Sequence, residues 1–127
     1  MDQAKQNGGT PLLIACALGH IECAQLLCDA GASLNQATDA GYTPLCLACE
    51  KGHLDIVWML LEANAAANQA DKQGATPLFI ACQNGYPEIV RLLLEAGAAV
   101  NRAPPHGATP LYIACEKGHR EVAKLLS

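Results

Sequence analysis

One short string recurs four times in this chain at a constant interval, and this recurrence restricts the possible folds more than any other feature. The copies read TPLLIACALGH, TPLCLACEKGH, TPLFIACQNGY and TPLYIACEKGH, and successive copies begin 33 residues apart, at Thr10, Thr43, Thr76 and Thr109. A period of about 20–50 residues is typical of solenoids and related arrays, in which each unit packs on the next. A catalytic site needs unlike residues at one place, so the repeat also favours a non-catalytic function.

Each repeat is predicted to begin with a short helix. Thr is a favoured N-cap and Pro suits the first helical position, so each Thr-Pro pair predicts a helix start. Nine residues after Thr, a Gly that tolerates the left-handed C-cap predicts the helix end, at Gly19, Gly52, Gly85 and Gly118.

A second, amphipathic helix is predicted to follow at once, as in HLDIVWMLLEAN, and to end at Gly31, Asn64 or Gly97. A polar link then leads to the next Thr through a predicted tight turn. One such unit cannot bury its apolar stripe alone, whereas four stacked units can. We therefore predict a single all-α solenoid domain over residues 1–127, with repeats at about 5–37, 38–70, 71–103 and 104–127, the last one truncated.

Composition excludes several classes of protein. The net charge is −4 with only eight Lys and Arg, which argues against nucleic-acid binding, since that binding depends on neutralising phosphates. No apolar run approaches the ~20 residues of a membrane helix, so no membrane association is expected. Seven cysteines is an odd number, which favours a reducing compartment, the cytosol or the nucleus.

The repeat resembles the ankyrin repeat. The family's T-P-L-H-x-A element corresponds to residues 43–48, its G-H pair to residues 52–53 and its G-A-x-x-N element to residues 97–101. The resemblance covers nearly the whole chain and implies helix pairs joined by β-turn or hairpin-like loops. Three features depart from the family pattern, the first of which is that Cys replaces the second Ala of the usual Ala-Ala pair in all four units. The residue after Thr-Pro-Leu is not His, so the bonds that this His makes in the family are replaced or absent, and Tyr86 replaces the His of the third G-H pair.

Cysteine chemistry offers an alternative function. Cys46 and Cys49 form a Cys-x-x-Cys pair near a predicted helix start, a setting that can lower a thiol pKa and support redox chemistry. Cys49 also belongs to a column of equivalent positions, with Cys16, Cys82 and Cys115, that is predicted to occupy a small core site. Cys23 and Cys28 align with apolar residues and are likewise predicted to be core.

Cys-His pairs four residues apart, such as Cys49 and His53, raise the question of zinc. Because a Gly ends the helix between the two residues and successive pairs lie in separate layers, we expect neither a metal nor any other cofactor. We also expect no enzymatic activity.

The resemblance implies that turn tips and first helices line a concave groove that binds protein partners. We expect three aromatic residues to anchor a partner, Tyr42, Phe79 and Tyr112. Alternatively, Phe79 and Tyr112 fill the space of the absent His. The matching polar groove positions are Asp39, Lys72, Gln73 and His106 at the turn tips, and Glu50, Lys51, Gln83, Asn84, Glu116 and Lys117 before the helix-ending glycines.

The sequence leaves several alternatives open for the function of the chain and for its contact surfaces. The chain is either a binding module, a thiol protein or a structural spacer within a longer array. Its last helix leaves Leu125 and Leu126 uncovered by any later repeat, so self-association through the ends is expected. Trp58 aligns with polar residues and is either a second contact or a lone exposed aromatic. The resemblance also implies a substrate role for Asn35, Asn68 and Asn101, which match the asparagine modified by asparaginyl hydroxylases.

Overall fold

The fold is a stack of four helix pairs. The computed structural model describes residues 10–102, 104 and 107–127, and that part of the chain contains eight helices and no strand. The pairs are α1 (Pro11–Leu18) with α2 (Ile21–Asp29), α3 (Pro44–Lys51) with α4 (Leu54–Glu62), α5 (Pro77–Asn84) with α6 (Pro87–Glu95), and α7 (Pro110–Glu116) with α8 (Arg120–Leu126). The predicted all-α solenoid is thereby confirmed.

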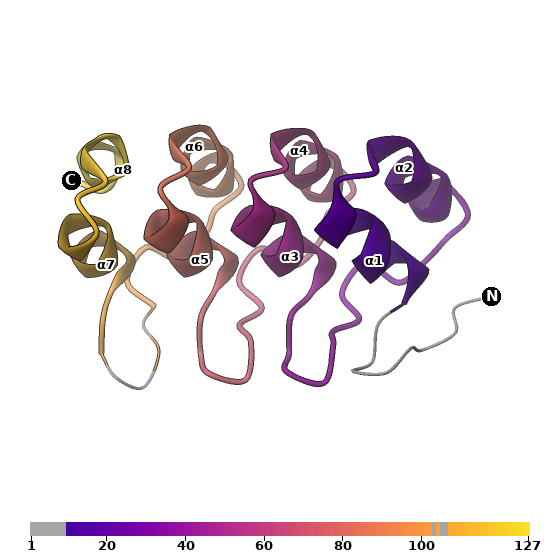
Figure 1. The fold of residues 1–127 in the computed structure, drawn as a ribbon, viewed down its shortest axis with the longest axis horizontal. Coiled ribbons are helices and arrows are strands. Elements are labelled where there is room, and N and C mark those ends of the chain that lie inside the picture. The colour runs from indigo at the N-terminus through magenta and orange to yellow at the C-terminus, as the bar shows by residue number, and fades with distance from the viewer. Residues whose placement is uncertain (1–9, 103, 105–106) are drawn as a thin grey trace.

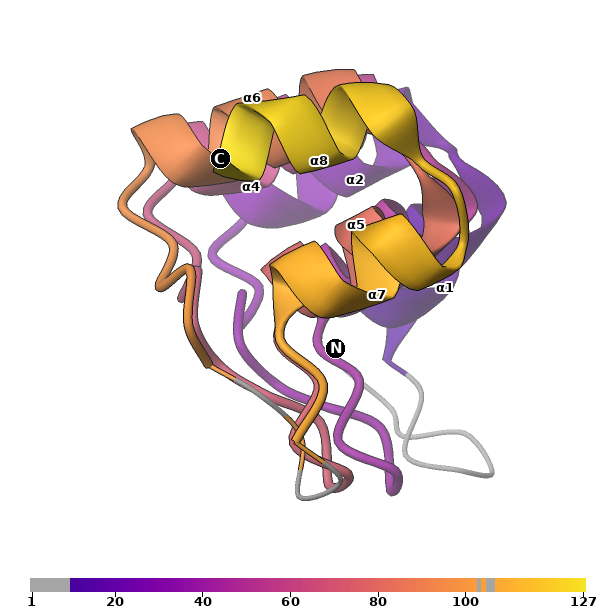
Figure 2. The same cartoon turned by 90° about the vertical axis from the view of Figure 1, so that its left-hand side faces the viewer.

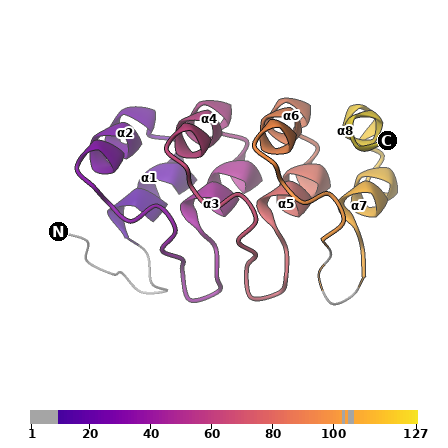
Figure 3. The same ribbon diagram turned by 180° about the vertical axis from the view of Figure 1, so that it is seen from behind.

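The stack has two helical layers and a row of loops. In Figure 1 the first helices α1, α3, α5 and α7 lie side by side, with the second helices above them and the loops projecting below. The view along the stack shows both layers and the loops together (Figure 2). From behind, the chain leaves each second helix and descends to the loop before the next unit (Figure 3). No helix in the described part of the chain is long and apolar enough to cross a membrane.

Each first helix begins as predicted. The Thr hydroxyl oxygen accepts a hydrogen bond from the backbone N–H three residues later, at 3.2 Å in all four units. Pro occupies the start of every one of these helices. An N-cap bond of this kind contributes about 1 kcal/mol to helix stability. Four identical caps therefore set the start of the four units in the same register.

The predicted helix ends are found with one small difference. Gly19, Gly52 and Gly85 adopt φ of 80°, 77° and 76° directly after α1, α3 and α5. The fourth first helix ends one residue earlier, so that Lys117 is its C-cap and Gly118, at φ 76°, follows. After the second helices, Gly31 and Gly97 have φ of 87° and 88°, and Asn64 is left-handed at 69°.

In the second, third and fourth units, the residue after the helix-ending glycine joins its unit to the preceding one. His53 Nε2 lies 3.3 Å from the Ala17 carbonyl oxygen, and His119 Nε2 lies 3.0 Å from that of Gln83. The Tyr86 hydroxyl donates to the Glu50 carbonyl at 3.4 Å. These carbonyls lie at the C-terminal ends of helices, where they have no intrahelical partner. Tyr86 thus makes the same inter-unit contact as the two histidines.

A second set of bonds joins the polar links. The side-chain oxygen of Asn35 accepts from the backbone N–H of Ala66 at 2.9 Å, and that of Asn68 accepts from Ala99 at 2.8 Å. In each pair the asparagine lies one unit before its partner. The repeated asparagine therefore connects successive units and fixes the spacing of the links.

Burial along the stack depends on having a neighbour, and two predictions about cysteine are wrong for this reason. Cys16, Cys49 and Cys82 are completely buried between first helices, but Cys115 is exposed, because no further first helix among the described residues packs on α7. Cys23 is also exposed, although its counterpart Ile56 is completely buried against the preceding unit.

Candidate functional site

A hollow of about 760 Å³ lies where the loops meet the first helices, and we call it the inner groove. It crosses the second, third and fourth units. Its lining residues are Tyr42, Glu50, Asp71, Gln73, Ala75, Phe79, Ile80, Gln83, Asn84, Pro104, Ile113, Glu116 and Lys117. Volumes of this order are typical of sites that enclose a ligand or a short peptide segment.

The inner groove has an apolar floor and a polar rim. Phe79, Ile80 and Ile113 are only 4–5% exposed and form the floor. The rim side chains are exposed and come mainly from the ends of the first helices, namely Glu50, Gln73, Gln83, Asn84, Glu116 and Lys117. An apolar centre with a polar, solvated edge is the usual anatomy of a protein–protein interface.

The three predicted aromatic anchors lie in three different environments. Tyr42 is half-buried in the wall of the inner groove, and burial, with the nearby Asp71 and Glu50 carboxylates, raises the pKa of its phenol. Phe79 is 4% exposed and belongs to the floor of the inner groove. Tyr112 is 57% exposed and lines a separate hollow of about 450 Å³, whose lining also includes Ile113 and Glu116.

A buried carboxylate shapes the loop wall of the inner groove. Asp71 is 8% exposed, and its Oδ1 accepts from the backbone N–H groups of Gln73 at 2.9 Å and Ala75 at 3.0 Å. The backbone N–H of Lys72 donates to the Ala40 carbonyl of the preceding loop at 3.0 Å. Neighbouring loop tips are therefore joined through their backbones, and the wall is held in place. Asp71 was not among the predicted site residues, although its position in an Asp-x-x-Gly turn is a recognisable signal.

The remaining predicted positions divide by location. Asp39, Lys51 and Lys72 are exposed but do not line the inner groove, and His106 lies outside the described residues. Ile80 and Ile113 were not predicted as site residues, because they belong to the repeated Ile-Ala-Cys string and a residue that recurs in several units indicates a structural role. Their role depends on the curvature between units, which a single repeat does not reveal.

The thiol alternative is disfavoured by burial. Cys46 and Cys49 are both completely buried, and the Cys46 thiol lies 3.8 Å from the Gln69 carbonyl oxygen, to which it donates. Burial raises the pKa of Cys46 and raises that of Cys49 well above its usual value. A redox or nucleophilic thiol needs the opposite shift, because the thiolate is the reactive form. No group of three or more His, Cys, Asp and Glu side chains suited to a metal ion occurs in the described part of the chain.

Comparison with known proteins supports the same architecture. A family model described as ankyrin repeats (3 copies) matches residues 1–71 and again residues 63–127, so its two matches together span the chain. The structure has four helix pairs over its described residues, one more than a single copy of that model. A search of curated proteins found no match.

Proposed function

The chain belongs to the ankyrin-repeat family, whose members are generally non-catalytic protein–protein interaction modules, and on this premise we propose that the inner groove binds a segment of a partner protein. The observation that carries the proposal is the hollow of about 760 Å³ that crosses three units, with a buried apolar floor and an exposed polar rim. A partner side chain that covers Phe79 and Ile113 gains apolar burial, and its flanking polar groups meet the rim.

The rim is also preorganised. The backbone carbonyls of Glu50 and Gln83 are held by Tyr86 and His119 of the following units. The opposite wall is held by the bond between neighbouring loop tips, from Lys72 to Ala40. A surface that is rigid before binding loses less conformational freedom when it binds, which leaves more of the contact energy as affinity.

We expect this function to be exercised without catalysis and in a reducing compartment, the cytosol or the nucleus. The raised pKa values of Cys46 and Cys49 and the odd number of cysteines support these two expectations. The spacer alternative makes a different prediction, since it requires that changes in the inner groove have no effect on any interaction.

Partner capture from cell extract tests the proposal. The groove variant combines Tyr42→Ala with Gln83→Arg, which removes a wall and places a long cation over the floor. The control, Gln25→Arg, introduces the same side chain on α2, at a position where the third unit already has Arg91. Circular dichroism verifies that both remain folded.

We expect a protein retained by the parent and the control to be lost from the groove variant. Equal retention by all three would refute groove binding and favour another surface. Loss from the control alone would assign the interaction to the outer helices. Retention of nothing by the parent would favour the spacer alternative.

We also propose that copies associate through the two ends of the stack. Leu26 is 68% exposed at one end, whereas its counterpart Met59 is 6% exposed between units. Leu111 is 38% exposed at the other end, whereas Leu45 in the second unit is 1% exposed. The two ends of the stack therefore expose the two complementary surfaces that meet at each junction between units inside the stack. Sedimentation velocity at increasing protein concentration is expected to show association of the parent. Leu26→Glu is expected to abolish this association, whereas the Leu18→Glu variant, changed outside the junction, is expected to associate as the parent does. A parent protein that stays monomeric at every concentration would refute the proposal.

A further inference from the structure

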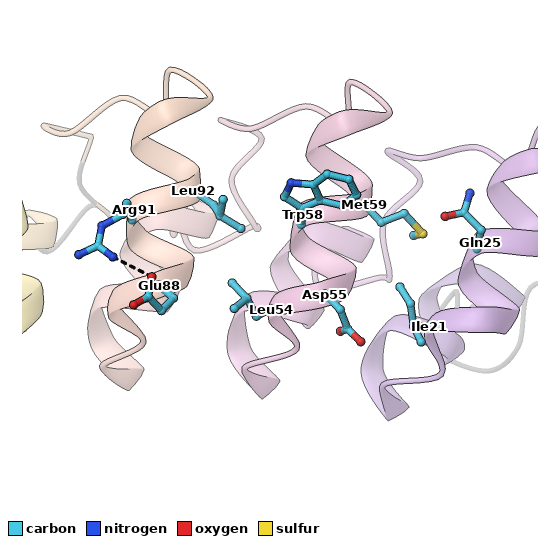
Figure 4. Close-up of a pocket in the computed structure, with 9 residues that line it drawn as sticks. All are labelled: Ile21, Gln25, Leu54, Asp55, Trp58, Met59, Glu88, Arg91 and Leu92. Carbon is cyan, nitrogen blue, oxygen red and sulfur yellow. Dashed lines mark hydrogen bonds and ion pairs between the residues drawn. The ribbon is translucent and has the colours of Figure 1, made fainter.

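The outer face of the stack carries a second hollow, which we call the outer hollow. It has a volume of about 580 Å³ and is formed by α2, α4 and α6. Figure 4 shows Leu54 and Trp58 on α4, with Leu92 reaching toward them from α6 and Met59 directed toward α2. The outer hollow lies on the second helices, away from the loops that form the inner groove, so the two surfaces are independent.

The centre of the outer hollow is apolar and accessible. Trp58 is 55% exposed and Leu54 is 41% exposed, while Met59, at 6%, is a buried part of the lining. The equivalents of Trp58 in the other units are Gln25, Arg91 and Lys124, so the repeat itself does not require an aromatic residue here. An exposed Trp beside a hollow is the residue type that most often dominates binding energy at interfaces.

Two rows of carboxylates run across the same three helices, and Asp55 and Glu88 line the outer hollow, while Glu62 and Glu95 line an adjoining hollow that shares Trp58 and Leu92 with it. One row lies in the first turns of the three helices, at Glu22, Asp55 and Glu88, and the other at their last residues, Asp29, Glu62 and Glu95. All six side chains are exposed. Arg91 is the one basic residue within α2, α4 and α6, and its guanidinium lies 2.7 Å from the Glu88 carboxylate.

Helix stability accounts for only one of the two rows. Carboxylates near a helix N-terminus are favourable, and Asp55 also accepts from the backbone N–H of Ile56 at 2.8 Å. At the C-terminus the helix dipole disfavours a negative charge, and none of these three helices has a basic residue in its last turn. The second row therefore has an electrostatic cost for the isolated protein that a cationic ligand would remove.

We propose that the outer hollow docks a helix of a partner protein whose apolar stripe is flanked on both sides by Lys or Arg. The two carboxylate rows are seven residues apart along each helix, or about 10 Å, which matches the ~10–12 Å diameter of a helix with its side chains. The apolar stripe covers Trp58 and Leu54, and the flanking cations face the two rows. A cation beside the indole gains further attraction from the ring.

A synthetic helix of this chemistry tests the proposal directly. The probe is a fluorescein-labelled peptide of about 14 residues, made of Leu and Lys only, with the leucines forming one helical stripe. At about 21 Å it is long enough to cross helices that lie ~8–10 Å apart. Trp58 is the one tryptophan in the chain, so its emission reports directly on the outer hollow. Peptide anisotropy gives the affinity, also for variants without Trp58.

We expect saturable binding, a blue shift of the Trp58 emission and weaker affinity at higher salt. Trp58→Gln, which installs the residue found in the first unit, is expected to weaken binding at least tenfold, as is common for an interface hot spot. Glu62→Gln is expected to weaken binding several-fold by removing one close charge. Asp39→Asn removes a carboxylate at a loop tip and is expected to leave the affinity unchanged.

Several results would overturn the proposal. These are absence of saturable binding, an unchanged affinity for Trp58→Gln or Glu62→Gln, and an equal loss with Asp39→Asn, which indicates general charge attraction. Equal binding of a Leu/Glu peptide would show that only apolar contact matters. Equal binding of a Lys-only peptide would show that only charge matters. Circular dichroism of each variant keeps loss of binding distinct from loss of fold.

Discussion

Alanine substitutions at two equivalent glycines distinguish the cost of a left-handed backbone conformation from the cost of a clash between neighbouring loops. Gly41 and Gly107 occupy the same position in two units, with φ of 90° and 88°. A Cβ on Gly41 would lie 2.7 Å from the backbone nitrogen of Lys72, whereas a Cβ on Gly107 meets no atom of the described residues within 4 Å.

We therefore expect Gly107→Ala to cost about 1–2 kcal/mol, from the left-handed conformation alone. Gly41→Ala is expected to lower the free energy of unfolding by at least about 1 kcal/mol more, because the neighbouring loop must move. Urea unfolding followed by circular dichroism measures both. Equal losses of unfolding free energy for the two variants would show that the loop at Lys72 can move away from residue 41 without a cost in stability.

Tyr86 provides a second test at the scale of one residue. Its hydroxyl makes the inter-unit bond that His53 and His119 make elsewhere. Tyr86→Phe is expected to lower the free energy of unfolding by about 0.5–1.5 kcal/mol through loss of that bond. Tyr86→His is expected to stay within about 0.5 kcal/mol of the parent, because His at this position reaches the same carbonyl. A larger loss for His than for Phe in urea unfolding would contradict the assigned equivalence.

At the scale of elements, the first helices bury free thiols where they pack together, and these thiols make the stability of the stack sensitive to alkaline pH. Cys16 on α1 and Cys82 on α5 are completely buried, and burial raises the pKa of each to about 12. In the unfolded chain these thiols ionise near their usual value of 9.0. Above that pH the unfolded chain holds fewer protons than the native state. The stability contributed by the neutral thiols is therefore complete below about pH 9 and is lost as the pH rises toward 12.

We expect the free energy of unfolding to fall by up to ~1.4 kcal/mol per pH unit for each such thiol within this window. Urea midpoints measured between about pH 8 and pH 11 give the slope. Cys82→Ala removes one titrating group, so its slope is expected to be shallower even though its stability at neutral pH is lower. A slope identical to that of the parent would contradict the assignment.

The same elements show what local signals can predict. Thr-Pro and Gly act through bonds within one helix, so helix starts and ends followed from short strings such as residues 43–52. The exposure of Cys115 did not follow, because the burial of an equivalent position depends on whether another unit covers it. The floor of the inner groove was missed for the same reason. Ile113 looks like scaffold in its own repeat and becomes part of a site only beside the third unit.

At the scale of the whole molecule, neighbouring units stabilise each other through a few defined contacts. The Asn35 side chain connects the first link to the second, and the Asn68 side chain connects the second link to the third. In a solenoid each unit contacts only its neighbours, so weakening one junction should affect the nearer end of the stack most. Opening free energies therefore differ along the chain and are measurable by hydrogen exchange.

We expect Asn35→Ala, at the first junction, to speed amide exchange mainly in α1 and α2, and Asn68→Ala, at the central junction, to speed it in both halves of the stack. Each change removes one hydrogen bond, so about 0.5–1.5 kcal/mol, or roughly two- to twelve-fold in the exchange rate of the affected helices, is the expected size. Hydrogen-exchange mass spectrometry on the two variants and the parent resolves the ends. If both variants changed all eight helices equally, the stack would unfold as one cooperative body. The asparagines would then support global stability and not the coupling between particular neighbours.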